Sequence, residues 1–279
     1  MTEWKMEDVL TALLDAGEVA LHYYDHPDAR LKSDKSIVTD ADHAIEHDLE
    51  KLFNHPENGS YLIGEETVDT KSNAFIEEAF RNVAWIVDPI DGTACYAHHI
   101  PIWGISIARM ERGTITDGGI YLPVTGEVFI SEGPAILYGS MPGTRMTPQD
   151  LSPVEIVKNA PDVSGMIAVT QSIVKHGSLS LGNPVQALSC AVVPLTYLLL
   201  GRYIAYLGTL KLWDIAGCTA LLNRAGYTCM FENGDVLGAD VTESFYNLEP
   251  DHPRRWWLKE RMLCAGSPDA IDYLLKGLG

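Results

Sequence analysis

Two aspartates end an apolar run in the stretch AWIVDPIDGT, which covers residues 84–93. If the apolar residues form a buried strand, its end carries Asp88 and Asp91 to the rim of a sheet, where α/β proteins usually bind ligands. Two neighbouring carboxylates raise each other's pKa unless a cation joins them. Ligand sets made of oxygen atoms suit Mg²⁺, which also keeps phosphate and water in its shell. The stretch therefore predicts a magnesium site.

Gly92 and Thr93 follow the two aspartates and are expected to begin a helix. A glycine lets the backbone pass close to a ligand. Amide groups at the N-terminus of a helix can hold a phosphate oxygen. We therefore expect a phosphate to bind at the same turn as the metal ion.

Two further acidic pieces follow or open apolar elements. Glu65 and Glu66 come directly after the apolar strand in SYLIGEE. Asp214 opens a helix in LWDIAG, and the apolar pattern of that helix turns its carboxylate toward the interior. The alternative for Asp214 is a first-turn aspartate that only caps the helix, which is common.

A fourth carboxylate comes from the stretch KSIVTDADHAIEH. If Ile45 marks the centre of the buried face of a helix, Asp42 lies about 60° from that centre and Asp40 lies on the far side. Asp42 is therefore expected to face a site and Asp40 to face solvent. His43 and His47 match a zinc-protease pattern here, but at about 160° from the buried stripe they should face solvent, so a zinc site is not expected.

The sequence does not decide the roles of other polar residues near these motifs. His98 and His99 contact a substrate or merely line a loop. Lys35 is interpreted as a solvated loop lysine that could also help to hold anions. Cys95 stands close to the two aspartates, but nothing indicates a lowered pKa of its thiol, so no nucleophile is assigned.

Helices and strands that must carry these groups alternate along the chain. Apolar residues at helical spacing predict helices at 6–24, from near residue 39 to 53, at 185–200 and at 213–225. Apolar runs predict strands at 60–66, 82–89, 165–171 and 202–207, and turns divide 102–131 into an antiparallel meander. The stretch 139–165 is rich in Gly, Pro, Ser and Asp. We expect an α+β lobe with most metal ligands at 1–138, and an α/β lobe with Asp214 and the specificity elements at 139–279.

The composition indicates a soluble globular protein with a strong negative charge. The chain has 279 residues and a formal net charge of −18, which should repel nucleic acid and anionic membranes. Five scattered cysteines form no C-x-x-C pair, as expected for reduced thiols. The first residues lack the pattern of a signal peptide, and the longest apolar stretch is too short to span a membrane. These features predict a cytoplasmic protein.

Four short motifs stand in order along the chain: VTDAD at 38–42, GEE at 64–66, WIVDPIDGT at 85–93 and WDIAG at 213–217. Together they resemble the inositol monophosphatase family of Mg²⁺-dependent, lithium-sensitive phosphatases. The stretch at 118–131 is also similar, so the resemblance covers nearly the whole chain. It implies a layered α-β-α-β-α sandwich, a homodimer, and hydrolysis of a small phosphate monoester by direct attack of a metal-activated water.

The resemblance implies a site with two or three Mg²⁺ ions. Glu65, Asp88 and the backbone carbonyl of Ile90 would hold one ion. Asp88, Asp91 and Asp214 would hold a second, so that Asp88 bridges the two. Paired metal ions stabilise both the attacking and the leaving oxygen of an in-line displacement.

The resemblance also implies the catalytic and phosphate-binding residues. Thr93, paired with Asp42, would orient or deprotonate the metal-bound water, and Glu65 would be the third catalytic residue. Asp91, Gly92 and Thr93 would contact the substrate phosphate. Phosphoryl transfer asks a protein mainly for such positioning and for neutralisation of charge.

The substrate side departs from the inositol-specific pattern. Family members that act on inositol phosphate usually have an acidic residue shortly before the Trp-Asp pair, whereas here Leu207 or Gly208 stands in that place. Histidinol phosphate, a 3′(2′),5′-bisphosphate nucleotide and a sugar phosphate are therefore alternative substrates. A regulatory binding protein on the same fold is the non-catalytic alternative.

Overall fold

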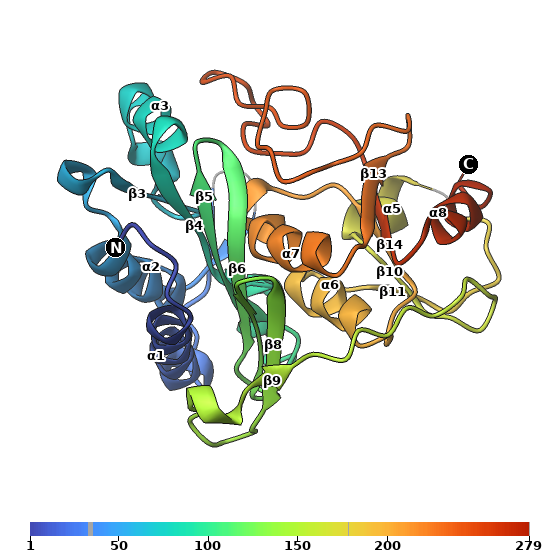
Figure 1. Cartoon of the computed structure of the whole chain (residues 1–279), viewed down its shortest axis with the longest axis horizontal. Coiled ribbons are helices and arrows are strands. Elements are labelled where there is room, and N and C mark those ends of the chain that lie inside the picture. The colour runs from blue at the N-terminus through green and yellow to red at the C-terminus, as the bar shows by residue number, and fades with distance from the viewer. Residues whose placement is uncertain (33–35, 178, 279) are drawn as a thin grey trace.

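The chain folds into five alternating layers of helices and sheets (Figure 1). The computed structural model describes residues 1–32, 36–177 and 179–278. The outer layers are α1 (Met6–Tyr24) with α2 (Asp40–Phe53), and α5 (Gln171–His176) with α8 (Pro268–Leu275). The middle layer, between the two sheets, holds α6 (Val192–Leu199) and α7 (Leu212–Arg224). The layered α-β-α-β-α sandwich implied by the resemblance is confirmed.

The first sheet has seven strands in the order β3-β4-β5-β6-β7-β8-β9. Their bounds are β3 Ser60–Gly64, β4 Val83–Asp91, β5 Gly104–Glu111, β6 Thr114–Leu122, β7 Glu127–Glu132, β8 Ala135–Ser140 and β9 Ser152–Pro153. The strands β4 to β9 pair antiparallel, which agrees with the predicted meander. In contrast, β3 and β4 are parallel, and Gly64 pairs with Val87. Because of this register, Glu65, the first residue after β3, lies beside Asp88 of β4.

The second sheet has five strands in the order β11-β10-β12-β14-β13. Their bounds are β10 Ile167–Val169, β11 Val185–Ala187, β12 Ala205–Gly208, β13 Thr228–Phe231 and β14 Met262–Ala265. The strands β11, β10 and β12 are parallel to one another. The chain leaves β12 and enters α7 after a short connection, so the end of this sheet lies beside the N-terminus of α7.

The predicted helix over 185–200 is wrong in its first part. Val185–Ala187 forms β11 on the edge of the second sheet, and α6 begins only at Val192. Pro194 stands in the first turn of α6, where a helix leaves amide groups without internal partners and tolerates proline. Pairing of β11 with β10, a contact between distant segments, overrides the local apolar pattern.

The remaining elements are short. They are β1 (Arg30–Leu31), β2 (Ile37–Val38), α3 (Asn73–Arg81), α4 (Thr93–Ala97) and the 3-10 helices Pro56–Asn58, Val68–Thr70 and Pro148–Asp150. The first sheet continues to Pro153, and the division into lobes at 1–138 and 139–279 stays a prediction. Among the described helices, none is long and apolar enough to cross a membrane.

Candidate metal and phosphate site

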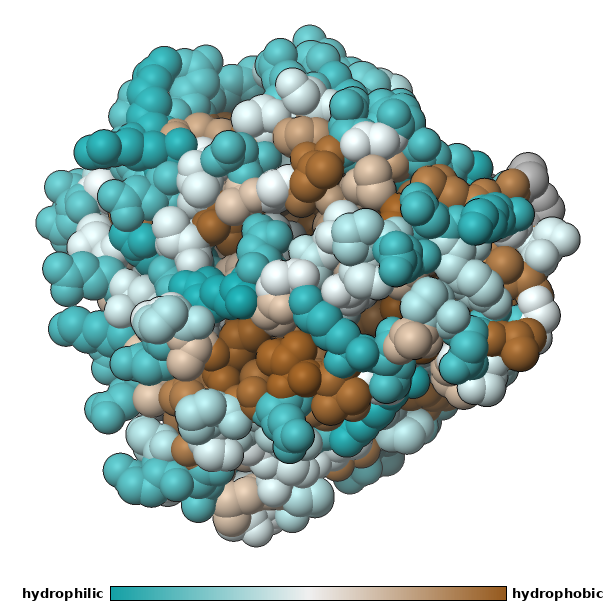
Figure 2. All heavy atoms as spheres, turned by 45° about the vertical axis from the view of Figure 1, so that its right-hand side comes forward, coloured by the Kyte–Doolittle hydropathy of each residue, from teal (hydrophilic) through white to brown (hydrophobic). Residues whose placement is uncertain are grey.

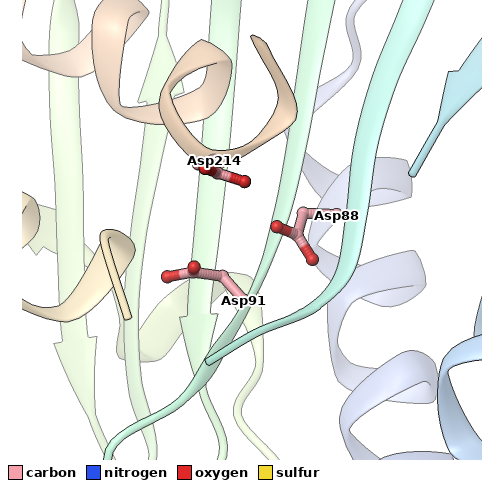
Figure 3. A group of neighbouring side chains, drawn as sticks. All are labelled: Asp88, Asp91 and Asp214. Carbon is pink, nitrogen blue, oxygen red and sulfur yellow. The ribbon is translucent and has the colours of Figure 1, made fainter. Parts of the chain in front are cut away.

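Three carboxylates from two distant parts of the chain meet between the first sheet and α7. Asp88 and Asp91 stand at the end of β4, and Asp214 stands in the first turn of α7. The three carboxylates lie close together (Figure 3), and one oxygen from each lies within 4.8 Å of the others. The structure thus brings together three of the metal ligands that the sequence predicts.

Asp88 is buried with one carboxylate oxygen left unpaired by the part of the chain that the structure describes. It is 1% exposed, and its Oδ1 has no partner among the described residues. Burial raises the pKa of Asp88 well above its usual range, and the neighbouring Glu65, Asp91 and Asp214 raise it further. A buried carboxylate among other carboxylates is costly unless a cation compensates it. An orphaned oxygen in an all-oxygen donor set fits a divalent cation such as Mg²⁺.

Asp91 joins the end of β4 to the N-terminus of α6. Its Oδ2 accepts hydrogen bonds from the backbone N–H of Ala191 and of Val192, both at 2.6 Å. The thiol of Cys190 donates to the same oxygen at 3.0 Å. Burial raises the pKa of Asp91 to about 6 in spite of these bonds. No local sequence pattern predicts this contact, because its partners lie about a hundred residues away.

Asp214 combines the two roles that the sequence left open. Its Oδ2 accepts a hydrogen bond from the backbone N–H of Lys211 at 2.9 Å, which caps α7. The carboxylate also belongs to the cluster with Asp88 and Asp91 (Figure 3). Its pKa rises to about 8 because burial, Asp91 and Glu65 all disfavour the anion.

Glu65 lies near this cluster but is held by two lysines that sequence reasoning missed. Its Oε1 is 3.1 Å from Lys211 Nζ and 3.4 Å from Lys32 Nζ. Lys32 Nζ also lies 2.6 Å from Glu66 Oε1. The group of three aspartates does not include Glu65, although the negative charge of Glu65 helps to raise the pKa of Asp88 and of Asp214. Neither lysine stands in an apolar motif, so a single sequence offers no signal for either contact.

Glu46 fixes the loop that carries Glu65. Its carboxylate accepts the backbone N–H groups of Glu66 and Thr67, both at 2.8 Å. The absence of a side chain at Gly64 is essential here, because a Cβ atom would lie 2.3 Å from the Glu46 carboxylate. Burial raises the pKa of Glu46 to about 7. Sequence reasoning missed this residue, although its helical position beside Ile45 places it on the buried face.

Asp42 is buried and faces Thr93, as expected from the helical pattern. Its Oδ2 accepts hydrogen bonds from Thr39, at 2.8 Å from the backbone N–H and 2.6 Å from the hydroxyl. Its Oδ1 lies 3.4 Å from Thr93 Oγ1, which also lies 3.0 Å from the carbonyl oxygen of Ile90. Burial raises the pKa of Asp42 to about 7. Asp40 instead pairs with an arginine, and its side chain is 43% exposed.

Gly92 makes the tight turn between β4 and α4. Its φ of +93° lies in the left-handed region, which favours glycine. A Cβ atom here would lie 2.9 Å from both the Ile102 carbonyl oxygen and the Cys190 Cβ. The turn therefore brings the start of α4 and the start of α6 close together. Amide groups at helix N-termini favour an anion at this point.

The other residues near the motifs lie outside this cluster. His43 and His47 are exposed, as expected. His98 is exposed, with Nδ1 2.8 Å from a backbone carbonyl of its own helical turn. His99 is also exposed and contacts a tyrosine ring edge-on. Lys35 lies outside the described residues.

The cysteines of the chain are free and buried. Burial raises the pKa of the Cys95 thiol, and the negative charge of Asp91 raises it too. A raised pKa disfavours the thiolate, which is the nucleophilic form. This agrees with the expectation that Cys95 is not a nucleophile.

Comparison with known proteins gives a family match and several relatives. The profile of the inositol monophosphatase family matches residues 3–274. A Nus factor SuhB of Xylella fastidiosa is 28% identical over 177 residues, which cover 57% of this chain and 59% of that protein. An inositol-1-monophosphatase of Caulobacter vibrioides is 26% identical over 227 residues, which cover 78% of this chain and 86% of that protein.

A solved structure shares the same fold. It is an IMPase/NADP phosphatase complexed with Mg²⁺ and phosphate, and it superimposes with a TM-score of 0.71. The match covers 96% of this chain and 92% of that chain at 16% sequence identity. At that identity, the likeness establishes the fold.

Proposed function

The chain belongs to the inositol monophosphatase family and is a phosphoric monoester hydrolase, and we propose that it hydrolyses a small-molecule phosphate monoester with Mg²⁺. The observation that carries this proposal is the group of Asp88, Asp91 and Asp214, whose oxygens lie within 4.8 Å of one another. Substrate phosphate and carboxylates are both anions, so a cation between them is needed for binding.

The metal ligands that we propose follow the family pattern. Glu65, Asp88 and the carbonyl of Ile90 are assigned to one ion, and Asp88, Asp91 and Asp214 to a second. Bound Mg²⁺ lowers the pKa of water and neutralises negative charge on a phosphoryl group. The Oδ1 of Asp88 supports the assignment, because none of the described residues donates a hydrogen bond to it.

Asp42 is proposed as the proton acceptor behind Thr93. The two side chains approach to 3.4 Å, and the pKa of Asp42 rises to about 7 by burial. A base with a pKa near the working pH combines a large ionised fraction with useful proton affinity. Thr93 would then orient the attacking water, and Asp42 would hold the proton. No phosphoenzyme is expected, because burial raises the pKa of both thiols near the site, those of Cys190 and Cys95.

Phosphate contacts are assigned to the turn after β4. Asp91, Gly92 and Thr93 are the proposed residues, as the resemblance implies. The N-termini of α6 and α7 lie at the same site, since Asp91 accepts the first amides of α6 and Asp214 caps α7. Aligned helix amides stabilise negative charge without a further cation.

A homodimer is also proposed, on the family resemblance. Figure 2 shows a mostly hydrophilic face with a contiguous apolar patch in its lower part. Contiguous apolar patches on a soluble protein mark interaction surfaces. Light scattering at several protein concentrations tests this proposal, and a monomeric mass at all of them would contradict it.

Phosphate release from a substrate panel tests the proposed function. The panel contains inositol 1-phosphate, histidinol phosphate, 3′-phosphoadenosine 5′-phosphate and fructose 1,6-bisphosphate, each with Mg²⁺ and with EDTA. We expect release from at least one member with Mg²⁺ and none with EDTA. If folded protein released no phosphate from any member, the regulatory binding protein would become the better explanation.

A further inference from the structure

A cavity of about 580 Å³ lies beside the connection from β12 to α7, between α5 and the segment that precedes β14. This size is typical of sites for small molecules. His176 comes from α5, and Thr209 comes from the connection. The third wall is formed by the segment before β14, with Arg254, Trp257 and Arg261.

The cavity adjoins the carboxylate site through Lys211. The backbones of Lys211 and Trp257 pair as an isolated antiparallel bridge. Lys211 Nζ is 5.8 Å from the centre of the Trp257 ring and 3.1 Å from Glu65 Oε1. Thr209 stands two positions before Lys211. The leaving group of a phosphate held at the carboxylates therefore has this cavity within its reach.

The lining of the cavity is cationic, although the whole protein carries a formal charge of −18. The guanidinium carbon of Arg254 lies 4.9 Å from the centre of the Trp257 ring. Within residues 1–32, 36–177 and 179–278, no carboxylate pairs with Arg254. Arg261 is held in place by Glu232, with Nε and Oε1 2.5 Å apart. An arginine stacked on an aromatic ring and without a carboxylate partner is preorganised to bind an anion.

Acceptors for sugar or inositol hydroxyls are scarce at this cavity. Of the described residues that line it, none is acidic. The connection from β12 to α7 also lacks a carboxylate before Asp214. Gly208, at the end of β12, leaves no room for one, since a Cβ atom there would lie 2.1 Å from the Thr170 side chain. Specific recognition of a polyol normally uses such acceptors.

We propose that this cavity receives the leaving group of the substrate, and that Arg254 on Trp257 selects a leaving group with a second anionic group. The second group is a phosphate or a carboxylate, and the guanidinium binds it with two parallel hydrogen bonds. The inference rests on the proposed function, because it assigns specificity to the same hydrolysis. The phosphate that is cleaved would lie at the metal-binding carboxylates with a cation between them, and the arginine would hold the anion that stays.

Matched substrate pairs test the proposal. One pair is 3′-phosphoadenosine 5′-phosphate against adenosine 3′-monophosphate, and the other is fructose 1,6-bisphosphate against fructose 1-phosphate. We expect the wild type to prefer the doubly phosphorylated member of at least one pair by about tenfold or more in kcat/KM, the discrimination that one charged hydrogen-bonded contact supplies. No preference in either pair would overturn the proposal.

Substitutions of two adjacent arginines test whether Arg254 causes the preference for doubly phosphorylated substrates. Arg254→Gln should reduce the preference about tenfold, and Arg254→Lys, which keeps the charge, should restore part of it. Arg255→Gln is the matched control, because Arg255 stacks instead on Trp256, 4.8 Å from its ring centre. The control should keep the wild-type preference. A preference that survives Arg254→Gln, or falls equally in both variants, would overturn the assignment.

A turnover assay and a binding measurement together separate a failure of this inference from a failure of the proposed function. Turnover of p-nitrophenyl phosphate, which has no second anion, reports hydrolysis alone. If wild type cleaves it with Mg²⁺ but shows no preference within the pairs, this inference fails and the proposed function stands. If wild type cleaves nothing, titration calorimetry with adenosine 5′-monophosphate in EDTA decides. Binding that weakens about tenfold in Arg254→Gln would support the cavity assignment, and equal binding by both proteins would overturn it.

Discussion

Glu127 on β7 and Asp88 on β4 are both almost completely buried in the same sheet, at 3% and 1% exposed. Glu127 accepts hydrogen bonds from Tyr197 at 2.6 Å, and from Tyr138 and Arg202 at 3.0 Å. Burial alone would raise its pKa, but these donors outweigh burial and the pKa of Glu127 is lowered. Across residues 1–32, 36–177 and 179–278 there is no donor for Oδ1 of Asp88, and its pKa is raised well above the usual range.

We interpret the difference as one between a structural carboxylate, Glu127, and a proposed metal-binding carboxylate, Asp88. The fold surrounds Glu127 with donors, so its charge is compensated by the protein itself. At Asp88 the fold adds two more aspartates instead of donors. A buried ion without a partner is destabilising by several kcal/mol, so such an arrangement requires a compensating cation. We infer that the protein leaves this compensation to the metal.

The largest effect on activity is expected from removing one carboxylate of the group formed by Asp88, Asp91 and Asp214. Asp214→Asn keeps an oxygen that can accept the Lys211 N–H, so α7 should remain capped. Loss of a metal ligand costs several kcal/mol of transition-state stabilisation, so kcat should fall by about a hundredfold or more. Phosphate release with Mg²⁺ is the measurement.

A matched control for Asp214→Asn is Asp269→Asn, because Asp269 also stands in the first turn of a helix, α8, but is exposed. The control should keep wild-type activity. An Asp214→Asn enzyme with more than about a tenth of wild-type kcat would contradict the assignment of this residue as a ligand.

Opposite changes in stability should follow from neutralising each of the two compared carboxylates. Glu127→Gln removes the charge that faces Arg202 and should lower the free energy of unfolding by about 1–3 kcal/mol. Asp88→Asn removes a charge that repels its neighbours and should raise the free energy of unfolding in EDTA. Urea unfolding of both variants measures the two effects. Shifts in the same direction would refute the distinction between the two sites.

The pH dependence of stability should differ with and without metal. The pKa of Asp91 is about 6 and that of Asp214 about 8 in the folded protein, against about 3.9 for an unfolded aspartate. The folded state then binds more protons than the unfolded state between about pH 4 and pH 8, so stability falls as pH rises through this window. Glu127 adds no such decrease, because its pKa in the folded protein is lowered and not raised.

Unfolding in urea at pH 5 and at pH 8 checks this prediction. In EDTA we expect lower stability at pH 8. With saturating Mg²⁺ the decrease should shrink, because the cation favours the ionised carboxylates. A protein equally stable at both pH values in EDTA would contradict the raised pKa values.

The smallest effect is expected at Glu46, which only positions the loop after β3. Glu46→Gln leaves one carbonyl oxygen for the two amides of Glu66 and Thr67. Such outer contacts typically cost about tenfold in metal affinity or activity. Asp48→Asn, on the exposed face of the same helix, is the control and should bind Mg²⁺ like wild type. Unchanged Mg²⁺ affinity in Glu46→Gln would contradict the proposal that Glu46 positions the loop after β3.

Most of the fold and part of the site could be predicted from local sequence. Helical spacing gave α1 as residues 6–24, in agreement with the structure, and it placed Asp42 inside and Asp40 outside. The apolar run before Asp88 predicted a buried strand that ends at the site, and the strand is β4. These features depend on periodicity and on residues close in the chain, which one sequence displays directly.

Contacts between distant segments could not be predicted in the same way. The edge strand β11 forms because it pairs with β10. The local apolar pattern of residues 185–187 instead predicts part of a helix. Lys211 meets Glu65 across 146 residues, and the N-terminus of α6 meets Asp91 across about a hundred. The donors around Glu127 likewise come from three different elements or loops. Such pairings depend on the complete packing of the sheets and have no local pattern.

Direct Mg²⁺ binding tests the central claim that Asp88, whose Oδ1 has no donor among the described residues, lies beside two other aspartates in order to hold a cation. Titration calorimetry would compare metal-free wild type with Asp88→Asn and Glu127→Gln. We expect wild type and Glu127→Gln to bind Mg²⁺ alike, and Asp88→Asn to bind at least about tenfold more weakly. A wild type that binds no Mg²⁺, or an Asp88→Asn variant that binds it as tightly as wild type, would contradict the account.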